Sequence, residues 1–218
     1  KTSTPSVQDY IDAFIPIVQG EMDIICICIS QGFSSSYQSA INAQKLLLEE
    51  YPHRRITVID STMATALQGL LVLEASAMKE NGIPYDKAVE CIEKLKGSGR
   101  IFFTIGNLDY LRHGGRIGKL TSIAGGILKI KPILALKDGE IISSGVARSN
   151  TKAQERVISL LKDYLSEKRE TLKSYSFTLG FGYDYGEVLA FKERLMAAFD
   201  KDNTLEEVPI VQIGATIG

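Results

Sequence analysis

The segment Ser30–Ser36 carries the residue types in this sequence that are best suited to chemistry. It reads SQGFSSS, follows the apolar run Met22–Ile29 and leads into the helix-like stretch Tyr37–Glu50. A short polar loop between a buried strand and a helix directs free backbone N–H groups outward, and serine hydroxyls add further donors, so such a loop suits a carboxylate or a phosphate. The alternative is a serine that only caps the helix. We call this segment the serine loop.

A second candidate is the glycine-rich segment 114–119, which contains Arg116 and follows Arg112. Its arginines suit an acidic ligand or an acidic partner surface. A phosphate-binding P-loop is excluded, because His113 and Leu120 stand where that motif requires Gly and Ser or Thr. The alternative is a solvated turn whose glycines supply left-handed backbone angles.

Groups that could activate a nucleophile or hold a metal are scarce. His53 and His113 are the two histidines, and the serine loop lacks the Gly-x-Ser-x-Gly pattern of a serine hydrolase. Cys26 and Cys28 share one face of the predicted strand, where we expect core packing rather than a metal site. We expect Asp60 to cap the following helix rather than hold a ligand. The residue types therefore favour binding over catalysis, with no cofactor and no metal.

Composition excludes several classes of protein. The chain has 218 residues, and 25 Lys and Arg against 26 Asp and Glu give a formal charge of -1. This balance argues against nucleic acid as a partner. The 44% hydrophobic and 23% charged fractions are those of an ordinary globular protein. No apolar run suits a membrane helix or a signal peptide, and three cysteines do not suggest a disulfide framework, so we expect a cytoplasmic protein.

Hydrophobic patterns predict the elements that position these residues. In the first half, strands and helices alternate, which predicts a parallel α/β/α domain with strands 22–29 and 55–60 and helices 37–50, 61–81 and 85–96. The chain opens at Lys1 in a turn-like segment, so we expect this domain to be incomplete at its N-terminus.

The second half has a different pattern, which predicts an α+β domain with a largely antiparallel sheet. Asp138-Gly139 between two apolar runs indicates a hairpin. The predicted strands are 100–105, 130–136, 140–146, 174–179 and 208–213, and the predicted helices are 152–168 and 186–199. Gly97-Ser98-Gly99 interrupts the pattern, so we predict domains at residues 1–97 and 98–218.

Several motifs together resemble the DegV family. They follow the family's order and spacing over essentially the whole chain: Thr2-Ser3-Thr4-Pro5-Ser6, the serine loop with Tyr37-Gln38-Ser39-Ala40, Val58-Ile59-Asp60-Ser61, and Leu111-Arg112-His113-Gly114-Gly115-Arg116-Ile117-Gly118. The resemblance implies a two-domain bacterial protein that binds a long-chain fatty acid, with the acyl tail enclosed between or within the domains. Some members of the family present this ligand to a separate fatty-acid kinase, which is therefore the expected partner.

The resemblance also assigns roles to residues. It implies that the ligand carboxylate is held by Thr2, Ser3, Ser34 and Ser36. It also implies that four further residues lie near the head group or on a surface that faces a kinase: Arg112, Arg116, Arg148 and Thr216. Thr216 stands where the family often has histidine, which leaves the kinase coupling open, and Ser35 and Ser36 replace the Gly and Thr that are usual in the serine loop.

The residues leave two other functions open. One is a stand-alone phosphoryl or acyl transferase that uses the glycine-arginine segment as a phosphate clamp, although it lacks an evident base, nucleophile pair or metal cluster. The other is a protein-interaction module in which bound lipid is structural. We expect a non-catalytic fatty-acid carrier, because hydroxyls without a neighbouring base can hold an anion but are not activated to attack one.

Overall fold

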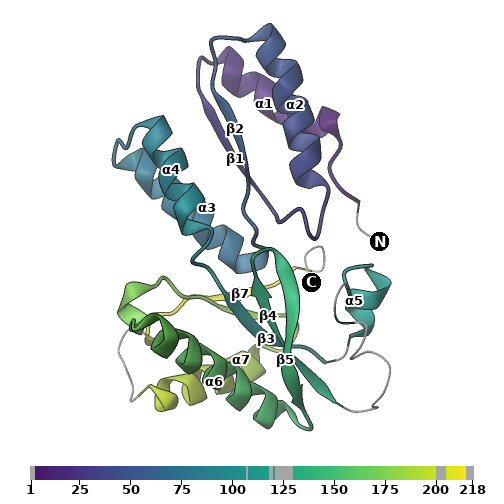
Figure 1. Ribbon diagram of the computed structural model, residues 1–218, viewed down its shortest axis with the longest axis vertical. Helices are drawn as coiled ribbons and strands as arrows, with labels where there is room; N and C mark the ends of the chain where they lie inside the picture. Colours follow the sequence, from purple (N-terminus) through teal and green to yellow (C-terminus); the bar gives the residue numbers. More distant parts are fainter. Residues whose placement is uncertain (1–2, 107, 118–119, 121–129, 200–204, 215–218) are drawn as a thin grey trace. The chain divides into compact units, whose positions relative to one another are not determined.

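The chain divides into two compact units, Lys1–Gly99 with Lys137–Glu140, and Arg100–Leu136 with Ile141–Gly218. The computed structural model describes residues 3–106, 108–117, 120, 130–199 and 205–214 (Figure 1). The sequence predicted domains at residues 1–97 and 98–218. That these two parts fold independently remains a proposal.

The first unit alternates helices with parallel strands. Its described elements are α1 (Val7–Gln19), β1 (Ile24–Cys28), α2 (Ser36–Glu50), β2 (Ile56–Asp60), α3 (Thr65–Glu80) and α4 (Tyr85–Leu95). Strands β1 and β2 pair in parallel, with a register that runs from Ile24 opposite Ile56 to Cys28 opposite Asp60.

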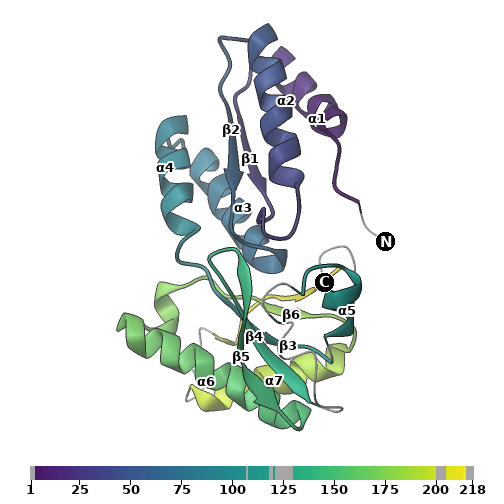
Figure 2. The ribbon, with the colours of Figure 1, turned by 45° about the vertical axis from the view of Figure 1, so that its right-hand side comes forward.

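Helices cover both faces of this two-stranded sheet. On one face, Ile24 and Ile56 pack with Phe14 of α1 and Leu47 of α2. On the other face, Ile59 of β2 packs with residues of α3 and α4 that include Leu71 and Ile92. Figures 1 and 2 show α1 and α2 on one side of the strands and α3 and α4 on the other. Because parallel strands share a direction, the loops after β1 and β2 meet at one edge of the sheet.

The second unit has an antiparallel sheet and a separate pair of strands. Its described elements are β3 (Ile101–Thr104), α5 (Asp109–His113), β4 (Lys131–Lys137), β5 (Glu140–Ala147), α6 (Asn150–Lys168), the 3-10 helix η2 (Leu172–Ser174), β6 (Leu179–Phe181), α7 (Tyr185–Ala198) and β7 (Ile210–Gln212). The sheet order is β3-β4-β5, and β3 pairs antiparallel with β4. Asp138 and Gly139 both have positive φ, as a two-residue hairpin turn requires.

The core of the second unit lies against α6. Ile133 of β4 packs with Ala153 and Val157 of α6, and further along the helix Ile158 and Leu165 belong to a second buried cluster. That cluster also contains Leu172, Leu195, Leu205 and Val208. No helix in the described part of the chain is long and apolar enough to cross a membrane.

The fold class predicted from the sequence is confirmed by the parallel first sheet and the antiparallel three-stranded sheet. One strand prediction, residues 174–179, is wrong: Leu172–Ser174 forms a 3-10 turn and strand β6 begins only at Leu179. Tyr175 and Phe177 in this segment pack against the buried cluster of α6 and α7, which explains the alternating apolar pattern. In addition, β6 and β7 are parallel rather than antiparallel.

The opening segment, expected to be turn-like, contains helix α1. Its start is a capping box, in which the Ser6 hydroxyl accepts from the Asp9 amide and the Asp9 carboxylate accepts from the Ser6 amide. Two further boundaries differ from the prediction. Helix α3 begins at Thr65 rather than Ser61, and α7 begins at Tyr185 with Asp184 as its cap.

Candidate ligand-binding site

The loops after β1 and β2 are tied together at the carboxyl edge of the first sheet. The Ser30 amide donates to the Met63 carbonyl at 2.8 Å, and one carboxylate oxygen of Asp60 accepts from the amides of Gln31 and Thr62 at 3.3 and 3.0 Å. Asp60 therefore holds the two loops instead of capping α3, whose N-cap residue is Ala64 and makes no side-chain cap bond. The expectation that Asp60 caps a helix is wrong.

Backbone strain is concentrated in the loop after β2 and at the first residue of α3. Thr62 and Thr65 have φ of 55° and 56°, in the left-handed region that β-branched residues avoid. Such conformations persist where the surroundings hold them, and they are most frequent at functional sites. The Asp60 carboxylate provides part of this restraint through the Thr62 amide.

The hairpin turn Lys137–Glu140, which belongs to the first unit, packs on the serine loop. The Ser30 hydroxyl donates to the Gly139 carbonyl at 3.1 Å, and Ser30 is 1% exposed. A Cβ atom on Gly32 would lie 2.5 Å from the Gly139 carbonyl oxygen, so this approach requires glycine. The base of the serine loop is therefore closely packed.

Four hydroxyls gather where the serine loop enters α2, and we call them the hydroxyl cluster: Thr4, Ser34, Ser35 and Ser36. The Oγ atoms of Ser34 and Ser36 are 2.7 Å apart, and Ser34 Oγ also accepts from the Ser36 amide at 3.2 Å. Thr4 Oγ1 lies 3.4 Å from Ser34 Oγ and accepts from the Ser35 hydroxyl at 3.2 Å. The structure thus joins the N-terminal Thr/Ser segment to the serine loop.

The amino end of α2 keeps donors for a ligand. Its N-cap residue is Ser35, whose side chain makes no cap hydrogen bond, and the amide of Ser36, the first helical residue, donates instead to Ser34 Oγ at 3.2 Å. Ser34 therefore takes the capping role that the alternative assigns to a serine. Within the described residues, no acceptor is recorded for the amides of Tyr37 and Gln38. Unpaired amides in the first turn of a helix suit an anion.

The predicted site residues fall in both units. Ser34 is half-buried and Ser36 is 7% exposed, and they contact each other. Ser3 is exposed, and it is its neighbour Thr4 that meets Ser34. Thr2 and Thr216 lie outside the described residues.

The predicted arginines belong to the second unit. Arg112 of α5 pairs with Asp109 at 3.2 Å, and Arg116 donates to the Gly114 carbonyl. Arg148 is exposed directly after β5. Their assignment to a head-group or partner surface remains a prediction.

Two residues, one in the hydroxyl cluster and one beside it, were not predicted as part of the site. Thr4 is one, and the other is Tyr10 of α1, whose hydroxyl lies 3.9 Å from Cys28 Sγ. The signal for both was present in the sequence, because the Ser6-x-x-Asp9 capping box predicts α1. A helix from this point places Tyr10 on the same face as Phe14.

Below the hydroxyl cluster, Cys26 and Cys28 point to the same side of β1, with their sulfur atoms 3.7 Å apart. Hydrogen bonding within the pair lowers the pKa of Cys28 and raises that of Cys26. Cys28 packs with Ala40 and Val58, in agreement with the predicted core role. In the described part of the chain, no group of three or more His, Cys, Asp and Glu residues suits a metal.

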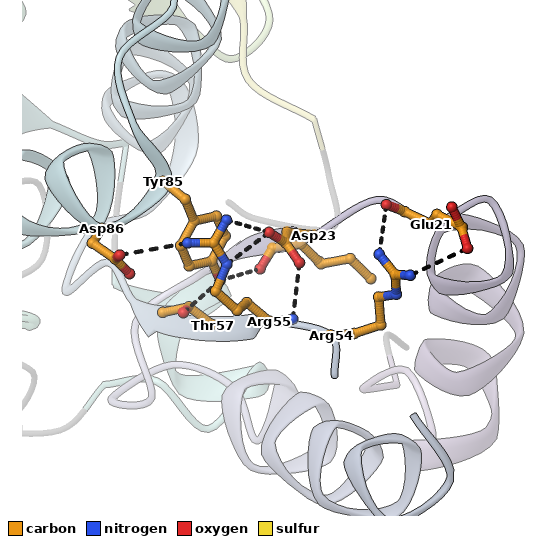
Figure 3. Close-up of polar contacts among 8 residues, drawn as sticks. Glu21, Asp23, Arg54, Arg55, Thr57, Tyr85 and Asp86 are labelled. Atoms are coloured by element: carbon orange, nitrogen blue, oxygen red, sulfur yellow. Dashed lines mark hydrogen bonds and ion pairs between the residues drawn. The ribbon is translucent and has the colours of Figure 1, made fainter. Parts of the chain in front are cut away.

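The opposite, amino edge of the same sheet is closed by charged and aromatic side chains (Figure 3). The Asp23 carboxylate accepts from the Arg55 amide at 2.9 Å and from Arg55 Nε at 2.7 Å. The Arg55 guanidinium also lies 4.2 Å from the centre of the Tyr85 ring and 3.4 Å from Asp86. The Tyr85 hydroxyl reaches Ile24 O and Thr57 Oγ1 at 2.8 and 2.6 Å. We call this set the amino-end clamp.

A pocket of about 360 Å³ lies in the second unit and contains none of the predicted site residues. Its walls include Leu165, Leu172 and Phe199, with Lys162 at its edge. The Lys162 ammonium stands 5.3 Å from the Phe199 ring centre. The pocket therefore shares no residue with the hydroxyl cluster, which lies wholly in the first unit.

Comparison with known proteins places these features in a family. The family model described as "Uncharacterised protein, DegV family" matches residues 1–218. A DegV domain-containing protein of Clostridium perfringens is 28% identical over 217 residues, which are 100% of this chain and 75% of that protein. Further curated relatives are matched over little more than half of their length, 56% and 57%.

Solved structures give the same result. The fatty acid (stearic acid)-binding protein of Eubacterium ventriosum is 41% identical with a TM-score of 0.83, over 92% of this chain and 68% of that one. The fatty acid kinase B3 protein of Streptococcus pneumoniae, loaded with linoleic acid, is 23% identical with a TM-score of 0.74, over 98% and 71%, and shows the shared fold. The chain therefore belongs to the DegV family.

Proposed function

We propose that this chain binds a long-chain fatty acid and holds its carboxylate at the hydroxyl cluster. The observation that carries the proposal is the convergence of Ser34, Ser36 and Thr4 at the open amino end of α2. The similarity to a stearic-acid-binding protein at 41% identity gives the ligand class.

The head group is where the protein must compete with a bilayer. Burial of about 15 methylenes at about 0.8 kcal/mol each supplies about 12 kcal/mol before ordering costs, and a bilayer offers the tail nearly the same gain. Hydrogen bonds to a charged group contribute about 1.5 to 3 kcal/mol each. The Ser34 hydroxyl and the amides of Tyr37 and Gln38 therefore supply the selectivity in this proposal, and the tail is buried between or within the proposed domains.

The proposed role is that of a carrier rather than a catalyst. The cluster supplies hydroxyls and amides, and among the described residues its contacts include no histidine that could act as a base. His53 and His113 are exposed, and His113 contacts the Asp109 carbonyl. In this proposal, Arg112, Arg116, Arg148 and the segment around Thr216 face a fatty-acid kinase. The three free thiols, Cys26, Cys28 and Cys91, fit a cytoplasmic location.

Mass spectrometry of lipid extracted from natively purified protein tests the proposal. We expect long-chain fatty acids in near-stoichiometric amount, and uptake of palmitate or oleate by delipidated protein. Absence of any acyl species together with no uptake would contradict fatty-acid binding.

A second assay separates a carrier from an enzyme. The chain is incubated with ATP, magnesium and fatty acid, with and without a fatty-acid kinase. We expect acyl phosphate only when the kinase is present. Acyl phosphate formed by the chain alone would support the stand-alone transferase instead.

A further inference from the structure

Ser30 is the first residue of the serine loop, and it organises the residues that follow. Its carbonyl accepts from the amides of Phe33 and Ser34 at 2.9 and 3.3 Å. Its hydroxyl accepts from the amide of Gly32 at 3.1 Å. These three bonds fold the loop back onto its first residue. The position of the Ser34 backbone therefore depends on Ser30.

Ser34 connects this turn to the start of α2. Its Oγ accepts from the Ser36 amide at 3.2 Å and lies 2.7 Å from Ser36 Oγ. The amides of Tyr37 and Gln38, which are proposed as donors to the carboxylate, follow in the first turn of the same helix. Groups that bind a ligand must be held within about 0.5 Å of the productive geometry. A displaced Ser34 would therefore disturb the hydroxyls and the helix start together.

Ser30 is itself held by two segments that lie far from it in the sequence. Its amide donates to the Met63 carbonyl at 2.8 Å, in the loop after β2. Its hydroxyl donates to the Gly139 carbonyl at 3.1 Å, in the hairpin turn Lys137–Glu140. Ser30 is 1% exposed, so solvent cannot replace either partner. The serine loop is thus fixed at its base by neighbours on both sides.

The hairpin turn fits against this base because residue 139 is glycine. Gly139 has a φ of 80°, which residues with a side chain rarely adopt. A Cβ atom there would also lie 2.8 Å from Ser30 Oγ and 3.6 Å from Thr62 Cβ. Any side chain at this position would push on Ser30 and on the strained loop after β2.

We infer that Ser30 and Gly139 are positioning residues for the proposed carboxylate site: the hairpin turn holds Ser30, and Ser30 holds Ser34 and the start of α2 in the arrangement that binds the carboxylate. The inference rests on the proposed function, because it concerns the same site. It makes the affinity for a charged head group depend on Gly139, which is 109 positions from Ser30 and outside the hydroxyl cluster.

The first test compares Gly139→Ala with the unchanged chain. Dissociation constants are measured for palmitate and for methyl palmitate, which has the same tail but no charge. We expect Gly139→Ala to weaken palmitate binding about three- to tenfold and to change methyl palmitate binding by less than about twofold. A role confined to stability would leave the ratio of the two constants unchanged, and that result would contradict the inference.

Gly82→Ala is the matched control. Gly82 follows α3 in the same unit and has a similar φ of 70°, but nothing lies within 4 Å of its Cβ position. This variant therefore carries the same kind of backbone strain without the contact to the serine loop. We expect unchanged constants for both ligands, and a loss of palmitate preference equal to that of Gly139→Ala would contradict the inference.

Ser30→Ala tests the same contact from the other side. It adds no atoms and leaves the Gly32 amide and the Gly139 carbonyl without the hydroxyl between them. We expect a similar loss of palmitate preference, about three- to tenfold. Ser30→Ala also keeps the inference testable if Gly139→Ala does not fold.

The double variant tests whether the two residues act through each other. Ser30→Ala removes the atom that a Cβ on Gly139 would approach most closely. The loss of palmitate affinity in the double variant should therefore be smaller than the sum of the two single losses, expressed as free energies. Fully additive losses would contradict a path that runs from the hairpin turn through Ser30.

The possible failures are distinguishable. An unchanged chain that does not bind palmitate would overturn the proposed function and this inference with it. An unchanged chain that binds palmitate, with the same preference for palmitate over methyl palmitate in Gly139→Ala and in Ser30→Ala, would overturn the inference alone.

Discussion

The two ends of the β1–β2 sheet carry similar numbers of polar side chains but use them differently. At the amino end, each member of the clamp is matched by another member, as Asp23 is by Arg55 and Tyr85 by Thr57. At the carboxyl end, the hydroxyls hold one another, and the Tyr37 and Gln38 amides in the first turn of α2 remain as donors.

This difference suggests that the amino end of the sheet stabilises the fold and that the carboxyl end binds a ligand. Polar groups that satisfy each other contribute to the stability of the fold and have little left for a ligand. Polar groups that are positioned by their neighbours but not saturated can bind an anion without first being reorganised. Substitutions at the amino end should therefore change stability alone, and substitutions in the hydroxyl cluster should change affinity alone.

The largest effect is expected from Tyr85→Ala in the amino-end clamp. It removes the ring beneath the Arg55 guanidinium and the hydroxyl bonds to Ile24 and Thr57. We expect the free energy of unfolding to fall by about 2 to 4 kcal/mol. Urea denaturation measures it, with Tyr85→Phe as a milder control at about 1 kcal/mol. Palmitate affinity of the folded variant should be unchanged, and a large loss of affinity would contradict the separation of the two ends.

Gly32→Ala should affect both properties, because Gly32 lies where the serine loop meets the hairpin turn. The added Cβ would lie 2.5 Å from the Gly139 carbonyl oxygen, so the loop must shift. We expect a loss of about 1 to 3 kcal/mol in the free energy of unfolding, together with weaker palmitate binding. Gly69→Ala in α3 is the control, since nothing lies within 4 Å of its Cβ position, and it should stabilise by about 0.5 to 1 kcal/mol. Equal stability of the two variants would show that the loop is not closely packed.

Ser34→Ala should affect affinity alone. We expect palmitate or oleate binding to weaken at least about tenfold, which corresponds to about 1.4 kcal/mol, while the midpoint of urea unfolding stays nearly constant. Ser98→Ala, at the end of α4, removes a serine hydroxyl that bonds the Leu95 carbonyl and serves as the control. An unchanged affinity in Ser34→Ala would remove this residue from the head-group site.

The smallest effect concerns pH and Asp23. Burial alone would raise the pKa of Asp23, but the hydrogen bonds from Arg55 outweigh it and lower the pKa. A carboxylate with a lowered pKa stabilises the fold above its unfolded value of about 3.9, and this contribution is lost as pH falls through the folded pKa. Asp23→Asn should therefore be less stable by about 1 kcal/mol at neutral pH, and the difference should shrink below about pH 4. A difference that is constant with pH would contradict the charge-based account of the clamp.

Sequence patterns predicted the sheet of the first unit and the serine loop because both are local features. The apolar run of β1 and the polar loop after it are visible in consecutive residues. The contact between Ser30 and Gly139 could not be predicted in the same way, since the two residues are 109 positions apart and meet only in the folded chain. The contact between Thr4 and Ser34 depends on such a meeting too, because these residues are 30 positions apart.

The missed helix has a different cause. The Ser6 and Asp9 capping signal was present, but Pro5 and the polar residues around it resemble a turn, and Pro16 lies within the helix itself. Once α1 is recognised, Thr4 and Tyr10 follow as neighbours of the serine loop. The strand predicted at 174–179 shows the opposite error, because Tyr175 and Phe177 alternate as in a strand while packing as core residues.

A crystal structure of the protein with bound palmitate tests the central claim most directly. The account predicts a carboxylate oxygen about 2.5 to 3.0 Å from Ser34 Oγ and within hydrogen-bond distance of the Tyr37 or Gln38 amide, with the amino-end clamp unchanged. A palmitate whose carboxylate lies away from Ser34 and from the first turn of α2 would contradict it.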